Sequence, residues 1–132
     1  MNIVIDTNVL VRLIVDDDQS AKARKIFGEA GSVTIPTHVF CECVWVLSSR
    51  YSAQSRHIAQ AIREFAQTEK VICDDAEVSA GLEMLDAGGD FADGVNAYSG
   101  MAMAPPHSIF VSFDKRAVRL LAGRGLSALV PE

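Results

Sequence analysis

Short apolar runs alternate with longer helix-forming segments along this chain, and the alternation limits the possible folds more than any other feature. The short runs have the length of strands, and the longer segments repeat their apolar residues at helical spacing. The expected strands are residues 2–6, 33–35, 71–73, 109–113 and 126–130, and the expected helices are residues 9–15, 19–30, 36–50, 55–67, 75–87, 90–104 and 115–122. Such alternation indicates an α/β domain with a parallel sheet and helices on both of its faces.

The length of the chain fits one domain, residues 1–132, with enough apolar residues for a core: 49% of the 132 residues are hydrophobic. The run at residues 109–113 is the strongest strand signal, because only Ser112 interrupts it, and it is typical of a strand covered on both faces. No apolar run is long enough for a membrane span, and the N-terminus lacks the basic region of a signal peptide. We therefore expect a cytoplasmic protein with no membrane partner.

The cysteines and the net charge also narrow the function. The three cysteines, Cys41, Cys43 and Cys73, are an odd number, which argues against a disulfide framework and favours small apolar side chains. The net charge is −5, whereas nucleic-acid binders more often have a basic surface. The charges are unevenly distributed, however: residues 69–93 hold eight acids and one base, and residues 115–124 hold four bases and no acid.

Two of the expected strands end on an aspartate, and this placement predicts a site. Asp6 follows the first apolar run, and Asp114 follows the run at residues 109–113. Ligands of open parallel sheets bind beyond the carboxyl ends of the strands, so we expect both aspartates at one edge of the sheet. Taken alone, an aspartate at a strand end is more often a helix cap or a turn residue.

Further acids lie on helices. Glu42 interrupts an otherwise apolar helix, where an unpaired charge would be costly to bury, although an exposed position or an arginine partner is an equal alternative. Asp90 and Asp93 are three residues apart on one helix face, Asn96 continues the stripe, and Asp90 alone is better explained as a cap. Clustered carboxylates repel one another, and a divalent cation such as Mg²⁺ or Mn²⁺ relieves the repulsion. Such a cation also allows an acidic site to accept a phosphodiester.

The residues around these acids resemble a known family. The motifs, in chain order, are residues 3–12 with Asp6, residues 35–51 with Glu42, residues 90–93 with Asp93, and residues 112–114 with Asp114. In order and spacing they resemble PIN-domain proteins, and within that group the VapC-type toxins of bacterial toxin–antitoxin pairs. The resemblance covers essentially the whole chain. The chain departs from the family pattern in small ways. Gly94 stands where alanine is common, and Ser112 stands where threonine is frequent. Gly94 and Gly100, which lies further along the same helix, are expected to loosen that helix.

The resemblance implies a helix-rich three-layer α/β/α sandwich with a mainly parallel central sheet. It also implies Mg²⁺- or Mn²⁺-dependent endoribonuclease activity, dimerisation, and inhibition by a small antitoxin protein that covers the acidic site. Carried over to this chain, it makes Asp6, Glu42, Asp93 and Asp114 catalytic. Asp6, Asp93 and Asp114 become metal ligands, Thr7 and Ser112 hold the carboxylates in place, and Asp90 and Asn96 are accessory candidates.

The cationic residues near these motifs are candidates for contacts with the RNA backbone, namely Arg12, Lys115, Arg116 and Arg119, although each taken alone is better explained as a solvated surface charge. The three histidines have no spacing that suggests a metal site. The sequence leaves open the RNA that is cleaved, the number of metal ions and the size of the oligomer.

Other classes of protein also place acids at parallel strand ends. A receiver-type signalling domain keeps paired acids near its first strand, whereas this chain has only Asp6 there. A haloacid-dehalogenase-type phosphatase needs a second aspartate where Asn8 stands. A non-catalytic PIN-like binding module is the third alternative, and the presence of all four family acids argues against it.

Overall fold

The computed structural model describes all residues from Met1 to Glu132 and has seven helices and five short strands. In chain order these are β1 (Asn2–Val4), α1 (Thr7–Ile14), α2 (Ser20–Glu29), β2 (Ser32–Thr34), α3 (Thr37–Ser49), α4 (Ser55–Gln67), β3 (Val71–Ile72), α5 (Asp75–Asp86), α6 (Phe91–Met103), β4 (Phe110–Val111), α7 (Lys115–Gly123) and β5 (Ala128–Leu129). Each expected strand and helix is present, although four of the five strands are shorter than predicted and β2 begins one residue earlier.

All strand pairs are parallel, which confirms the predicted fold class. The first sheet has the order β1-β2-β3, with Ile3 opposite Val33 and Val33 opposite Val71. The second sheet contains only β4 and β5, with Phe110 opposite Ala128. The strands thus form two sheets.

The division into two sheets corrects one expectation. Asp6 follows β1 and Asp114 follows β4, and these strands belong to different sheets, so the two aspartates do not share a sheet edge. The edge argument requires β4 to pair with β1, but β4 pairs with β5 instead. Residues 109–113 were also expected to be covered on both faces, and this is wrong: Val111 is 53% exposed and Phe113 80% exposed, because the small sheet has an uncovered face.

Apolar periodicity and, in four of the seven helices, a capping aspartate explain where the helices form. In α3, Phe40, Cys43 and Leu47 recur at helical spacing and are all buried, whereas the opposite side of the helix reaches solvent. Four helices begin after an aspartate whose carboxylate accepts a backbone N–H, namely α1, α5, α6 and α7. The Gly88–Gly89 turn after α5 contains Gly88 at φ +89°, a conformation that glycine adopts without strain.

The main core is a cluster of 20 buried residues between the first sheet and helices α1, α3, α4, α5 and α6. Helices α5 and α6 approach each other closely, and glycines permit this approach. A Cβ on Gly94 would collide with the Ala80 carbonyl oxygen, and a Cβ on Gly81 would lie 2.6 Å from the ring of Phe91. The missing side chain of Gly94 therefore makes room for α5, a role in addition to the loosening of the helix expected from the sequence.

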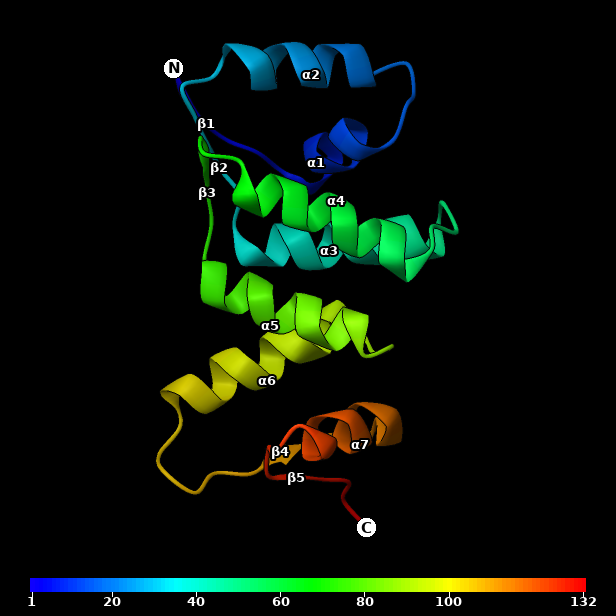
Figure 1. The fold of residues 1–132 in the computed structure, drawn as a ribbon, viewed down its shortest axis with the longest axis vertical. Helices are drawn as coiled ribbons and strands as arrows, with labels where there is room; N and C mark the ends of the chain where they lie inside the picture. The colour runs from blue at the N-terminus through cyan, green and yellow to red at the C-terminus, as the bar shows by residue number, and fades with distance from the viewer.

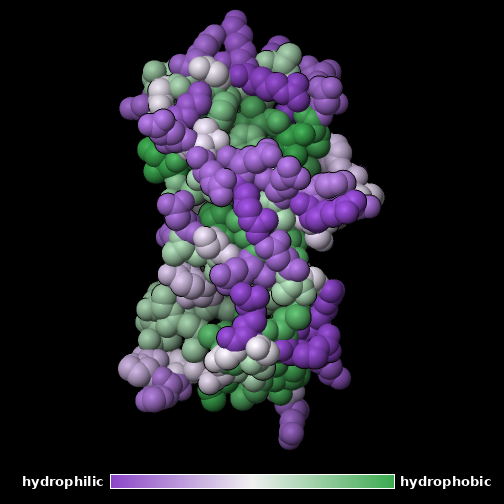
Figure 2. All heavy atoms as spheres, viewed as in Figure 1, coloured by the Kyte–Doolittle hydropathy of each residue, from purple (hydrophilic) through white to green (hydrophobic).

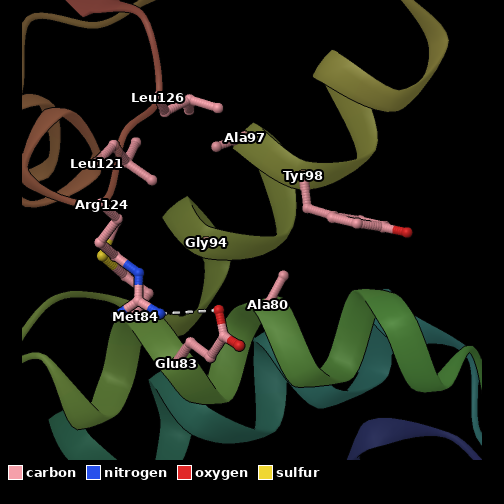
Figure 3. Close-up of a pocket in the computed structure, with 9 residues that line it drawn as sticks. All are labelled: Ala80, Glu83, Met84, Gly94, Ala97, Tyr98, Leu121, Arg124 and Leu126. Carbon is pink, nitrogen blue, oxygen red and sulfur yellow. Dashed lines mark hydrogen bonds and ion pairs between the residues drawn. The ribbon is translucent and has the colours of Figure 1, made fainter.

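The C-terminal elements pack on this helix pair through a smaller cluster around Met84, Ala97 and Leu121. A largely apolar cavity of about 160 Å³ lies beside that cluster, between α5, α6 and the end of α7, with Arg124 bonded to Glu83 across its wall (Figure 3). None of the four predicted catalytic acids lines this cavity.

The elements are arranged along one long axis. Helices α1 and α2 lie at the N-terminal end, α3 and α4 follow beside the first sheet, α5 and α6 come next, and α7 with the small sheet lies at the other end (Figure 1). On the face drawn in Figure 2, hydrophobic residues reach the surface over the C-terminal elements. None of the helices has the length and apolar character needed to cross a membrane.

Candidate active site

Asp6 and Glu42 line one open cleft between α1 and α3. Asp6 precedes α1 and accepts the Thr7 backbone N–H at 2.7 Å, so its carboxylate is fixed by the start of the helix. Thr7 is buried, and its hydroxyl donates to Oε2 of Glu42 at 3.3 Å across 35 residues of sequence. The hydroxyl therefore links the start of α1 to the Glu42 carboxylate, on the cleft that Asp6 also lines. Glu42 itself is exposed, which agrees with the exposed alternative considered for it.

The cleft has a volume of about 310 Å³, and acidic as well as basic side chains line it. The α1 segment contributes Asp6, Thr7, Asn8, Val11 and Arg12, and the α3 segment contributes Glu42, Val46, Arg50 and Tyr51. Sequence reasoning gave no role to Arg50 or Tyr51. Helical spacing could have found Arg50, because Glu42, Val46 and Arg50 are four residues apart and therefore share one helix face, but no such signal points to Tyr51.

Arg12 is fixed at the wall of the cleft. Its Nη1 donates to the Asn8 carbonyl at 3.1 Å, and its Nε lies 3.7 Å from Asp17 Oδ2. That Nε is buried and has no hydrogen-bond partner. A guanidinium held in this way has a defined orientation and donor groups left to offer a ligand, because it has five N–H donors in all.

Asp93 belongs to a second group of acids. Partial burial raises its pKa, and the charges of Asp90 and Asp114 raise it further. These three carboxylates are therefore close enough to repel one another. The raised pKa means that the charged form of Asp93 is unfavourable without a cation nearby.

Two of these acids are helix caps in the structure. The carboxylate of Asp90 accepts the Ala92 N–H at 3.3 Å, and that of Asp114 accepts the Ala117 N–H at 3.0 Å. The predicted role of Ser112 in holding a carboxylate takes a different form, because its hydroxyl accepts the backbone N–H of Asp114 at 3.0 Å. Ser112 thus fixes the main chain at Asp114. Capping and metal binding are compatible, since a carboxylate has a second oxygen.

Cys41 lies between the two groups of acids. Burial raises the pKa of its thiol to about 11, and the charges of Asp90, Glu77 and Glu42 contribute to the rise. The side chain of Cys41 is therefore within electrostatic reach of Glu42 from the first group and of Asp90 from the second. Cys43 is buried, Cys73 is partly buried, and all three cysteines are free thiols.

The structure thus brings the four predicted catalytic acids into two groups, Asp6 with Glu42, and Asp93 with Asp114. No three acidic, histidine or cysteine side chains lie close enough together to hold one cation. Asn96 is exposed on α6, and Lys115, Arg116 and Arg119 are exposed around the start of α7, beside Asp114.

Trp45 is exposed although most of α3 is apolar. Its side chain is 58% exposed, with the guanidinium carbon of Arg50 5.9 Å from the ring centroid. Phe65 packs edge to face on Phe27 with ring centroids 5.7 Å apart and is partly buried against the core.

Comparison with known families identifies the family of this chain. The family model of the PIN domain matches residues 3–120, a span that includes all four of the predicted catalytic acids. The chain belongs to the PIN-domain family. This membership confirms the family expected from the sequence motifs, and it sets aside the receiver and phosphatase alternatives.

Two further comparisons concern individual proteins. A search of curated proteins gave no match to this PIN domain. Among solved structures, it is similar to Mycobacterium tuberculosis VapC20, described as a sarcin–ricin-loop-cleaving toxin. The sequence identity is 15% and the TM-score 0.45, with 100% of this chain and 90% of that chain covered.

Proposed function

We propose that this PIN-domain protein is a metal-dependent endoribonuclease, and that it acts as the toxin of a toxin–antitoxin pair. The observation that carries the proposal is the cleft in which the Asp6 and Glu42 carboxylates open to solvent while the Thr7 hydroxyl bonds to Glu42. In a PIN-domain chain whose motifs resemble those of VapC-type toxins, such a cleft is the expected place for hydrolysis of an RNA phosphodiester.

The chemistry of the acids fits a small divalent cation. Carboxylate oxygens are the ligands that Mg²⁺ and Mn²⁺ prefer. The pKa of Asp93 is raised first by burial and then by the charges of Asp90 and Asp114, and a nearby cation would offset this cost of the charged form. The family motifs assign the cation to Asp6, Asp93 and Asp114, although no three acids lie close enough together in this structure to hold one ion, so Asp93 and Asp114 would have to move toward Asp6 to bind it. When bound there, the cation supplies a water of lowered pKa and neutralises charge on the scissile phosphate.

The residues of the chain itself have distinct roles in this proposal. Glu42 is placed to orient the attacking water and to accept its proton, and Thr7 holds Glu42 for that task. Ser112 fixes the backbone from which the Asp114 carboxylate extends. Asp90 acts mainly as the cap of α6, which positions Asp93 one turn further along, and Asn96 remains an accessory candidate.

The proposed partners follow from the resemblance to VapC-type toxins. They are an RNA substrate, a small antitoxin protein that covers the acidic cleft, and a second copy of the chain in a homodimer. Because the RNA and the antitoxin are both made in the cytoplasm, we place the protein there. A basic side chain of an antitoxin would satisfy the same carboxylates that a cation would otherwise neutralise.

An RNA cleavage assay tests the proposal. Purified protein is incubated with mixed cellular RNA in Mg²⁺, in Mn²⁺ and in EDTA, and the 5′ ends of the products are mapped. We expect cleavage that requires the metal and is lost in Asp6→Asn while the far-UV circular dichroism spectrum is unchanged. Full activity of Asp6→Asn would refute the mechanism, and no activity of the wild type under any metal condition would favour a non-catalytic PIN-like module.

A further inference from the structure

The cleft between α1 and α3 is polarised along its length. The residues that line the cleft occur in the same order on both of its sides: Asp6 and Thr7 precede Arg12 on the α1 side, Glu42 precedes Arg50 on the α3 side, and the Thr7 hydroxyl bonds to Glu42 at the acidic end. Asp6 and Glu42 lie toward one end of the cleft, and Arg12 and Arg50 lie further along the same helices. Eight residues of α3 separate Glu42 from Arg50, which corresponds to about 12 Å of helix. The charge along the cleft therefore changes from negative to positive over a distance longer than a single phosphate group.

The positive end of the cleft also carries aromatic rings. Arg50 is exposed, has no ion pair with any acid, and lies over the ring of Trp45 at 5.9 Å. Trp45 is 58% exposed and Tyr51 46% exposed, although exposing a large aromatic side chain forfeits the free energy of its burial. Arg50 and Tyr51 line the cleft, whereas Trp45 lies outside its lining and meets it through the guanidinium of Arg50; we call these three residues together the aromatic rim of the cleft.

We propose that the aromatic rim is a nucleotide-binding subsite, which holds the RNA nucleotide next to the cleaved phosphodiester by stacking its base on Trp45 or Tyr51 and pairing its phosphate with Arg50. This inference rests on the proposed ribonuclease function. With the scissile phosphate at the carboxylate end, the strand continues along the cleft, and it is a neighbouring nucleotide that reaches the rim. Arg12, fixed at the wall, offers a second cationic contact on the way.

The chemistry of the rim favours single-stranded RNA over a protein or a second copy of the chain. Exposed aromatic faces beside a free guanidinium are the combination that binds unpaired nucleotides, because every base has a π-face. An apolar protein partner would leave Arg50 without a counter-charge, whereas a phosphate provides one. Stacking on a ring is tolerant of sequence, so the rim adds affinity for an unpaired strand without selecting a base.

The chain carries its own probe of this subsite, because Trp45 is its only tryptophan. Tryptophan fluorescence is followed while a single-stranded RNA dodecamer is added in Mg²⁺ to the Asp93→Asn variant, in which cleavage is expected to be blocked. We expect saturable quenching. A Lys25→Gln control should bind as tightly, since Lys25 is exposed on α2 away from the cleft, whereas Arg50→Gln should bind more weakly. Arg50→Gln should also reduce the slope of log affinity against log salt by about 0.7, the value for one lost phosphate contact on a single strand.

Cleavage kinetics provide the second measurement. Trp45→Ala should raise KM about tenfold, which corresponds to the loss of one base stack, with kcat little changed. Trp45→Phe should restore much of the affinity because it keeps a ring face, a rescue that a purely structural role for Trp45 does not predict. Both substitutions are on an exposed side chain, so thermal unfolding should show folded variants of nearly wild-type stability.

The outcomes separate this inference from the proposed function. Metal-dependent cleavage with no tryptophan quenching and with an unchanged KM in Arg50→Gln and Trp45→Ala would overturn the subsite and leave the nuclease intact. Quenching that is weakened in Arg50→Gln, without any cleavage by the wild type, would support the RNA subsite and overturn the catalytic proposal. A fluorescence change that depends on protein concentration but not on RNA would overturn the subsite and assign the rim to a contact between two copies of the chain.

Discussion

Gly94 and Gly100 lie on the same helix, α6, and the same substitution at the two positions should have opposite effects on stability. A Cβ at Gly94 would collide with the Ala80 carbonyl oxygen and lie 2.7 Å from the Met84 Cβ, whereas nothing lies within 4 Å of a Cβ at Gly100. Alanine in place of glycine stabilises a helix interior by up to about 1 kcal/mol. At Gly94 this gain is opposed by overpacking, which costs up to about 3 kcal/mol when backbone must move.

The net effect of Gly94→Ala is therefore a loss of about 1–2 kcal/mol, and that of Gly100→Ala a gain of about 0.5–1 kcal/mol. For a chain of 132 residues, each kcal/mol shifts Tm by about 3–4 °C. We expect Tm to fall by about 3–8 °C in Gly94→Ala and to rise by about 2–4 °C in Gly100→Ala. Thermal unfolding followed by circular dichroism measures both. A rise of similar size in the two variants would refute the close approach of α5 and α6.

Three further predictions concern the site and the core. Asp93→Asn should raise Tm at pH 7 in EDTA. The pKa of Asp93 is raised in the folded state, so ionisation of this carboxyl destabilises the folded wild-type protein as pH rises. The advantage of the variant should vanish near pH ~3.9, where the carboxyl is also protonated in the unfolded state. Cys43, whose pKa burial raises to about 12, should resist iodoacetamide in the native protein at pH 8 and react once the chain is unfolded in urea; rapid labelling of the native protein would contradict its burial. Thr7→Val should lower kcat/KM for RNA about 10- to 100-fold by releasing Glu42, and an unchanged value would show that the hydroxyl does not position it.

Most helices could be predicted from the sequence because their signals are local. The helix expected at residues 55–67 forms as Ser55–Gln67, since its apolar residues share one face and polar residues surround them. The double glycine after α5 and the double proline after α6 end those helices close to the expected residues, because both features interrupt helical hydrogen bonding.

Strand pairing and burial could not be predicted in the same way, because they depend on contacts between distant segments. The run at residues 109–113 has the composition of a buried strand, and nothing within it reveals that β4 pairs only with β5. Helix α3 is apolar on nearly every side, so its periodicity does not distinguish the buried face from the face where Trp45 meets solvent. A two-stranded sheet with an uncovered face leaves apolar side chains exposed, even where the sequence has the composition of a buried strand.

The site shows the same limit. The motifs identified Asp6, Glu42, Asp93 and Asp114 as the acids to examine, but only the structure shows Thr7 bonded to Glu42 across 35 residues and Asp93 repelled by Asp114. It also shows that Asp90 caps α6, which the sequence had left open between a cap and a ligand. Spacing within one helix is visible in a sequence, whereas the meeting of α1 with α3 is a property of the packed chain.

The central claim is that the two groups of acids, Asp6 with Glu42 and Asp93 with Asp114, serve one metal-dependent reaction. Isothermal titration with Mn²⁺ tests it most directly, on the wild type and on the Asp6→Asn and Asp93→Asn variants, with Lys25→Gln as a control. We expect both aspartate substitutions to weaken the same binding event by more than about tenfold, while the control binds as the wild type does. Unchanged Mn²⁺ binding in Asp93→Asn, with binding lost in Asp6→Asn, would show that the two groups act separately and would contradict the claim.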